Sequence, residues 1–127
     1  MSDIPTDLNY ASSHEWVSVE GDTAIIGISD HAQEELTELV FIELPEIGRE
    51  LTAGDPCAVV ESVKTASDIY APVSGQVIET NDALDTEPGT VNEDPYGDGW
   101  FFKVRLTDSS ELDDLLSPED YAEQVNT

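Results

Sequence analysis

Basic residues are almost absent from this sequence. Its 127 residues include 4 lysines and arginines but 29 aspartates and glutamates, which gives a formal net charge of −25 at pH 7. Proteins bind nucleic acids and anionic membrane surfaces through basic side chains that neutralise phosphates. The composition therefore argues against both partners, and we expect this protein to bind neither nucleic acid nor a membrane.

Cysteine and long apolar runs are also scarce. The single cysteine, Cys57, excludes an intramolecular disulfide, and its place at the start of an apolar run favours a buried thiol over a reactive one. No apolar run approaches the ~20 residues that a membrane-spanning helix needs. The first residues have neither the basic region nor the apolar region of a signal peptide. These absences predict a soluble protein of the cytoplasm.

Several motifs with known chemistry are missing too. The two histidines, His14 and His31, lie far apart without a cysteine pair, so no metal-ligand spacing is present. The acidic loop at 92–94 lacks the EF-hand pattern, and the sequence has neither a glycine-rich phosphate loop nor a G-x-S-x-G motif. Trp16 and Trp100 are expected in the core or in a cleft wall rather than as stacking platforms for bases. We expect no metal site.

The acidic residues are spread along the whole chain rather than gathered in a tail. This distribution is typical of a solvated surface and not of an acidic binding arm. At molar ionic strength the Debye length falls to about 3 Å, so carboxylates farther apart barely repel each other, whereas in dilute buffer their repulsion opposes the compact state. We hypothesise that the protein comes from a high-salt cytoplasm and loses stability when salt is removed.

The high charge does not imply disorder, because 39% of the residues are hydrophobic and strand-like runs recur throughout. The length favours one domain, residues 1–127, with a real hydrophobic core. Many short strands separated by turns, with helices mainly near the end, predict a compact, mostly β sandwich.

Alternation, turn and capping signals predict the individual elements. We expect strands at 14–19, 23–28, 39–44, from 57 into a hairpin, at 73–79 and at 100–106. Helical segments are expected at 30–36, at 81–84, after 109 or 110 and from 118 towards 125, with a long ordered loop at 85–99. Asp30 and Ser117 are the expected N-caps of their helices, and Pro118 is the expected first helical residue.

The most informative stretch is 59–75, which contains one of only two lysines in the chain. Lys64 is bracketed by valine, isoleucine and tyrosine, which favour strands, with small polar turn residues in between. This pattern predicts a β-hairpin with Lys64 at or beside its tip. A Schiff-base lysine needs a pocket, so a lysine among turn residues better suits covalent attachment of a cofactor. The other lysine, Lys103, alternates with Arg105 on the polar face of a strand and is interpreted as structural.

The segment E-S-V-K-T-A-S-D-I-Y-A-P-V-S-G closely resembles the lipoyl-attachment segment of the H-protein family of the glycine cleavage system. Four more segments extend the resemblance over nearly the whole chain: S-H-E-W-V, G-I-S-D-H-A-Q-E-E-L, V-F-I-E-L-P-E-I-G and V-N-E-D-P-Y-G-D-G-W. Five segments in this order are highly specific. Thr65 departs from the alanine that the family more often has, a change that a turn should tolerate.

The resemblance implies a lipoyl-domain-like barrel-sandwich hybrid, mostly β, with short helices and a C-terminal helical segment. It also implies lipoate attached covalently to Lys64, on a carrier that is not an enzyme and has no catalytic residue of its own. The implied partners are a pyridoxal-phosphate glycine decarboxylase, a folate-dependent aminomethyltransferase, dihydrolipoyl dehydrogenase and lipoate-attaching enzymes. Such a carrier moves an aminomethyl group between enzymes, and its protein part supplies placement and protection.

The resemblance further implies a cleft for the aminomethyl group. This group is prone to hydrolysis on sulfur, so a cleft that excludes water would protect it but would have to supply acceptors for a cationic amine. The family assigns this role to Ser13, Glu15 and Asp68 on the matching positions. Without the resemblance, Glu15 and Asp68 would be interpreted as ordinary surface acids.

Other carriers also place a lysine on a hairpin. A biotin carrier usually has methionine on both sides of it, whereas Val63 and Thr65 flank Lys64 here. A lipoyl domain of a 2-oxoacid dehydrogenase typically has D-K-A at the tip and a flexible linker, and neither is present. An unmodified acidic interaction module, and a paralogue that relays lipoyl groups to other enzymes, remain open alternatives.

Overall fold

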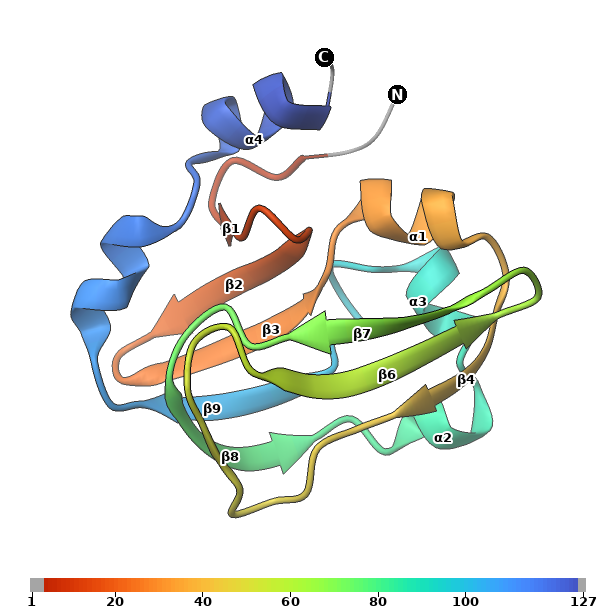
Figure 1. The fold of residues 1–127 in the computed structure, drawn as a ribbon, viewed down its shortest axis with the longest axis horizontal. Helices are drawn as coiled ribbons and strands as arrows, with labels where there is room; N and C mark the ends of the chain where they lie inside the picture. Colours follow the sequence, from red (N-terminus) through yellow and green to blue (C-terminus); the bar gives the residue numbers. More distant parts are fainter. Residues whose placement is uncertain (1–3, 126–127) are drawn as a thin grey trace.

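Two antiparallel β-sheets form the framework of the computed structural model, which describes residues 4–125 (Figure 1). Within this range, the larger sheet has six strands in the order β1-β2-β3-β9-β8-β5, and the smaller has three in the order β4-β6-β7. The strands are β1 Asn9–Tyr10, β2 Glu15–Glu20, β3 Thr23–Ile28, β4 Leu39–Glu43, β5 Glu50–Leu51, β6 Pro56–Ser62, β7 Ala66–Tyr70, β8 Gly75–Thr80 and β9 Phe102–Leu106. This arrangement agrees with the predicted mostly β sandwich.

The predicted strands are present with shifted ends. The strand expected at 14–19 begins one residue later, because His14 has a positive φ of 79°, which a strand does not continue. The strand expected from Trp100 begins at Phe102. The sequence does not predict β1 and β5, since two residues are too few to show alternation.

Both sheets contribute to one main hydrophobic core. Ile26, Val77 and Val104 of the larger sheet are fully buried, as are Ile42 and Val60 of the smaller one, and all five belong to one cluster. Because successive side chains of a strand point to opposite faces, these residues mark the inner face of each sheet. The two inner faces therefore pack together, which leaves the outer face of the smaller sheet to solvent.

A second, smaller cluster lies apart from the main core. It joins Leu8, Tyr10 of β1, Trp16 of β2 and Tyr121 of the last helix, all of them buried. The last helix thereby packs against the start of the chain, where β1 also bridges to Leu116. Residues near the two ends of the sequence thus lie together beside β2 (Figure 1).

The helices are short: α1 Asp30–Leu36, α2 Ala83–Thr86, α3 Thr90–Glu93, the 3₁₀ segment η1 Ser109–Asp114 and α4 Pro118–Val125. The N-cap prediction for α1 is wrong by one residue: Ser29 is the N-cap, and its Oγ accepts from the Ala32 amide at 3.2 Å, whereas Asp30 is already helical. The cap prediction for α4 is confirmed, since Ser117 Oγ accepts from the Asp120 amide at 3.2 Å.

The predicted loop at 85–99 is only partly a loop. The helical turn expected at 81–84 lies two residues later as α2, and α3 falls inside the predicted loop. A four-residue helix makes a single turn and shows no apolar periodicity, so the proline and glycine signals of this segment dominated the prediction. No helix within residues 4–125 is long and apolar enough to cross a membrane.

Candidate functional site

The β6–β7 hairpin carries Lys64 in its connecting turn. The Ser62 amide donates to the Thr65 carbonyl at 2.7 Å, and Ser62 Oγ accepts from the amides of Lys64 at 3.2 Å and Thr65 at 3.1 Å. One serine side chain therefore organises the turn backbone, as expected of serine in turns. The predicted hairpin is confirmed, and its turn extends beyond the neighbouring strands (Figure 1).

The two lysines have different surroundings. The Lys64 side chain is exposed, and within residues 4–125 it forms no hydrogen bond or ion pair. Lys103 Nζ, in contrast, lies 3.5 Å from Glu79 Oε1 and 5.0 Å from the centre of the Trp100 ring. The structure thus agrees with the interpretation of Lys103 as structural, and it leaves the Lys64 amine accessible for a covalent attachment.

A small cleft of about 150 Å³ lies between the start of β2, the end of β3, helix α1 and strand β7. This volume equals that of about five molecules of liquid water, so the cleft can hold a small terminal group rather than a long chain. Two predicted residues line it, Ser13 and Asp68. Asp68 lies four residues after Lys64, which is roughly 13 Å along a strand.

Glu15 lies behind this cleft and does not line it. Its side chain is 1% exposed, and its carboxylate accepts hydrogen bonds from Ser13 Oγ and from the Tyr70 amide, the latter at 3.3 Å. Burial raises the pKa of Glu15 to about 7, against the opposing effect of these hydrogen bonds. Glu15 is therefore partly protonated at neutral pH, and a cation beside it would favour the ionised form.

The backbone around Ser13 and Glu15 is held by the C-terminal helix. His14 is in the left-handed region, its Nδ1 lies 2.8 Å from the Tyr121 hydroxyl, and this hydroxyl lies 2.6 Å from Ser29 Oγ. Tyr121 also stacks on Tyr10 with ring centres 4.5 Å apart. The contact between His14 and Tyr121 thus fixes the segment that carries Ser13 and Glu15.

Sequence reasoning missed His14, Glu35 and Tyr121 as parts of this region. His14 and Glu35 line the cleft, and Glu35 Oε1 lies 2.5 Å from His31 Nε2. The pKa of His14 is lowered, mainly by burial and also by His31, while Glu35 opposes both effects. A non-glycine residue with positive φ has no clear signature in one sequence, so only the structure identifies this position.

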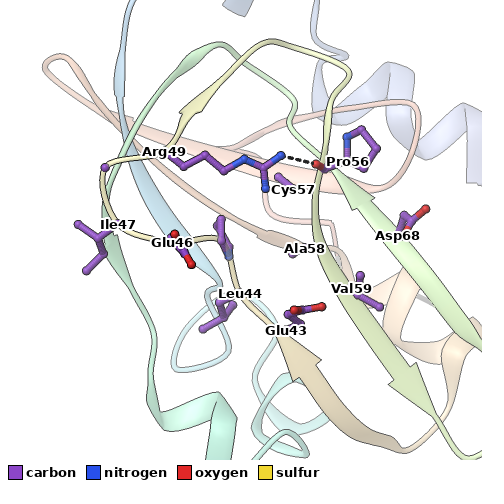
Figure 2. Close-up of a pocket in the computed structure, with 12 residues that line it drawn as sticks. Glu43, Leu44, Glu46, Ile47, Arg49, Pro56, Cys57, Ala58, Val59 and Asp68 are labelled. Atoms are coloured by element: carbon purple, nitrogen blue, oxygen red, sulfur yellow. Dashed lines mark hydrogen bonds between the residues drawn. The ribbon is translucent and has the colours of Figure 1, made fainter.

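A second, larger hollow of about 750 Å³ lies at the other end of the smaller sheet (Figure 2). It is lined by the segment from Glu43 to Arg49 and by β6, with Asp68 at its edge. Cys57 also lines it; burial raises the pKa of its thiol to about 12, and Sγ donates to the Ile69 carbonyl at 3.2 Å. The prediction of a buried cysteine is confirmed, and apart from Asp68 no predicted site residue lines this hollow.

Metal-ligating side chains do not gather in the described part of the chain. Among residues 4–125, no group of three or more histidine, cysteine, aspartate or glutamate side chains could hold a metal ion. The candidate site consists, then, of the Lys64 turn and of the cleft lined by Ser13 and Asp68, with the buried Glu15 behind Ser13.

Comparison with known proteins gives consistent matches along nearly the whole chain. A family model described as "Glycine cleavage H-protein" matches residues 8–127. The glycine cleavage system H protein of Alcanivorax borkumensis is 57% identical over 127 residues, which cover 100% of this chain and 99% of that protein. The corresponding protein of Shewanella loihica is 61% identical over 122 residues, 95% of each chain.

The fold matches as well. The crystal structure of a glycine cleavage system H protein from Mycobacterium marinum has a TM-score of 0.90 and 42% sequence identity, and the match covers 98% of this chain and 100% of that chain. The predicted fold, a mostly β barrel-sandwich hybrid with short helices and a C-terminal helical segment, is therefore confirmed.

Proposed function

The chain belongs to the glycine cleavage H-protein family, and from this premise we propose that Lys64 carries a covalently attached lipoyl group. The chain is a non-catalytic component of a multienzyme system. The observation that carries the proposal is the exposed Lys64 amine, which has no partner within residues 4–125 and stands on a turn fixed by Ser62. Lipoate attached there supplies a dithiolane that can accept an aminomethyl group and hand it on.

The carrier role implies that several enzymes act on this chain one after another. A pyridoxal-phosphate glycine decarboxylase would deliver the aminomethyl group, a folate-dependent aminomethyltransferase would remove it, and dihydrolipoyl dehydrogenase would restore the oxidised arm. A lipoate-attaching enzyme must act before any of these. The protein itself holds Lys64 away from its body, so the same amine can be presented to several active sites in turn.

The cleft would protect the cargo between these visits. Ser13 and Asp68 line a hollow that fits a small group, and Glu15 lies directly behind Ser13. A cationic amine in the cleft would lower the pKa of Glu15 from about 7, so Glu15 would release its proton and become a charged partner. We expect loading of the arm at pH 7 to be accompanied by this proton release.

Mass spectrometry of the intact protein and of its peptides, purified from its native host, tests the attachment. We expect the mass of a lipoyl group on the peptide that contains Lys64. Biotin at this position, or no adduct under any growth condition, would defeat the proposal. Loss of glycine oxidation by the reconstituted system on Lys64→Arg would then connect the modification with the pathway.

The lifetime of the aminomethyl-loaded protein tests the cleft. Glu15→Ala should shorten this lifetime, because it removes the acceptor nearest to Ser13 and opens the buried site to water. Glu20→Ala is the matched control, since Glu20 lies on the same strand but is exposed. Equal lifetimes of the two variants would remove the cleft proposal while leaving the attachment at Lys64 intact.

The acidic surface leads to a separate proposal, adaptation to a high-salt cytoplasm. It is supported by the 29 acidic residues, of which few have a cationic partner among only 4 lysines and arginines. Screening at molar salt should then raise the melting temperature. Equal melting temperatures in dilute buffer and in molar potassium chloride would count against this adaptation.

A further inference from the structure

Large apolar side chains are exposed directly beside the lysine turn. Val40 is 51% exposed, Phe41 48% and Val63 64%. We call these three residues the hairpin patch. In a chain whose surface is dominated by carboxylates, apolar side chains gathered in one place indicate an interaction site rather than chance exposure.

The three residues are close to one another: Val40 and Phe41 lie on β4, and Val63 lies in the turn that directly follows β6. Phe41 pairs with Glu61, and Val63 follows Glu61 by two residues, which places Phe41 and Val63 on the same outer face. A bulge between Leu39 and Phe41 leaves Val40 as an additional residue on β4, and its side chain is exposed. The patch thus extends from β4 to the residue that directly precedes Lys64.

The backbone under the patch is well held. The Val63 amide donates to the Glu38 carbonyl at 3.0 Å, which ties the turn to the segment leading into β4. The Ser62 amide and side chain fix the other half of the turn. A partner can therefore bind a preformed surface and loses little free energy in ordering it.

Exposed acids border the patch on all the elements that form it. Glu38 precedes β4, Glu43 ends β4 on the face shared with Phe41, and Glu61 lies between Phe41 and Val63. Apart from Lys64, no lysine or arginine lies at residues 38–43 or 61–66, the two segments that form the patch. A complementary partner presents an apolar contact surrounded by lysines and arginines.

We propose that the hairpin patch is the docking surface for the enzyme that acylates Lys64. This inference rests on the proposed function. Enzymes that use the finished arm need to reach only its far end, whereas an acylating enzyme must bring the Lys64 amine itself into its active site. Such an enzyme therefore contacts the residues around the turn, and the patch begins at the residue next to Lys64.

The reaction requires an activated carboxylic acid, here an acyl adenylate, which forms when the carboxylate of lipoic acid attacks the α-phosphorus of ATP and pyrophosphate leaves. Lys64 Nζ, after losing a proton, attacks the acyl carbon and forms the amide C–N bond. The bond between the acyl carbon and the phosphate oxygen breaks, adenosine monophosphate leaves with the electron pair, and the nitrogen loses a second proton. No oxidation or reduction takes place.

The test measures the acylation of purified, unmodified protein by the lipoate-attaching ligase of the host, with lipoic acid and ATP. The variant combines Val40→Thr, Phe41→Thr and Val63→Thr, since threonine keeps the strand preference and substitutions at exposed sites change the stability little. Ile47→Thr is the matched control, because Ile47 is 64% exposed but lies beside the larger hollow at the other end of β6.

We expect kcat/KM for acylation to fall at least about tenfold in the triple variant, mainly through KM, and to stay within about twofold in the control. The variants, acylated by prolonged incubation, should then support the glycine decarboxylase reaction at the normal rate. Unchanged acylation, or a fall confined to the decarboxylase reaction, would overturn the inference without touching the proposed function. Failure of the ligase to acylate the unaltered protein at all would defeat both.

Discussion

The lysine turn and the cleft differ in how the chain builds them. The turn is made from consecutive residues, 62–66, and the hydrogen bonds of the Ser62 side chain that shape it join residues at most three apart, with one longer-range bond from the Val63 amide to the Glu38 carbonyl. The cleft is assembled from the segment before β2, from β3, α1 and β7, and its wall is fixed by a contact between His14 and Tyr121, which are 107 residues apart. One site is local and exposed, whereas the other depends on the complete fold.

Because of this difference, substitutions at the two sites should affect function and stability differently. Substitutions at the turn remove few contacts, so they should affect the attached chemistry and leave the free energy of unfolding nearly unchanged. Substitutions in the cleft wall disturb buried polar groups, so they should change the stability and the chemistry together. A carrier can thus present its cofactor on a simple turn, but protection of the cargo requires a packed and polar interior.

The largest expected effect lies at the turn. Lys64→Arg should abolish lipoyl attachment completely, because the guanidinium is not a nucleophile at neutral pH. The free energy of unfolding, measured by urea titration, should stay within about 0.5 kcal/mol, since the side chain is exposed. Lys103→Arg is the control and should keep full attachment. An adduct that persists in the Lys64→Arg protein would place the modified residue elsewhere.

The same difference explains what could be predicted from the sequence. The Lys64 hairpin follows from β-forming residues on both sides of a polar turn, and a local pattern of this kind is readable without the fold. The α4 cap at Ser117 is local too, and its prediction is confirmed. The sequence predicts Asp30 as the N-cap of α1, whereas the structure has Ser29, because both residue types favour caps and only the backbone conformation separates them.

The cleft could be predicted only in part. Ser13, Glu15 and Asp68 came from a family resemblance, and no pattern of spacing joins residues of β2 with residues of β7. That Glu15 is buried was not predictable, because a glutamate among 29 acids reads as a surface residue. The role of Tyr121 depends on the packing of the last helix against the first strand, which is a long-range contact.

The next effect concerns pH. The pKa of Glu15 is about 7 in the folded protein and about 4.5 when unfolded, so the folded state holds this proton more tightly. The proton on Glu15 therefore contributes favourably to the free energy of unfolding. This contribution is complete below pH 4.5 and is lost as the pH rises through 7, by at most about 3 kcal/mol. Glu15→Gln should remove this loss, and the variant should therefore gain stability relative to the original protein between pH 4.5 and 7.

Urea titrations at several pH values check this prediction. The quantity compared is the difference in the free energy of unfolding between the variant and the original protein. The difference cancels the general repulsion among the other acids, which also grows with pH. Glu20→Gln is the control, because it makes the same change at an exposed position of the same strand. If the difference in the free energy of unfolding for Glu15→Gln does not change with pH, burial does not raise the pKa of Glu15, and Glu15 is ionised in the folded protein.

The smallest expected effect tests whether the two regions are independent. Tyr121→Phe keeps the stacking on Tyr10 but removes the hydroxyl that lies 2.8 Å from His14 Nδ1 and 2.6 Å from Ser29 Oγ. We expect a loss of about 1–2 kcal/mol in the free energy of unfolding.

If Tyr121 positions Ser13 and Glu15 through His14, the aminomethyl-loaded form should also hydrolyse faster, while acylation of Lys64 proceeds at the normal rate. Tyr70→Phe, at a tyrosine on β7 that is 39% exposed, is the control for both measurements. A slower acylation of the Tyr121→Phe protein would contradict the separation, because the turn would then depend on the same packing as the cleft.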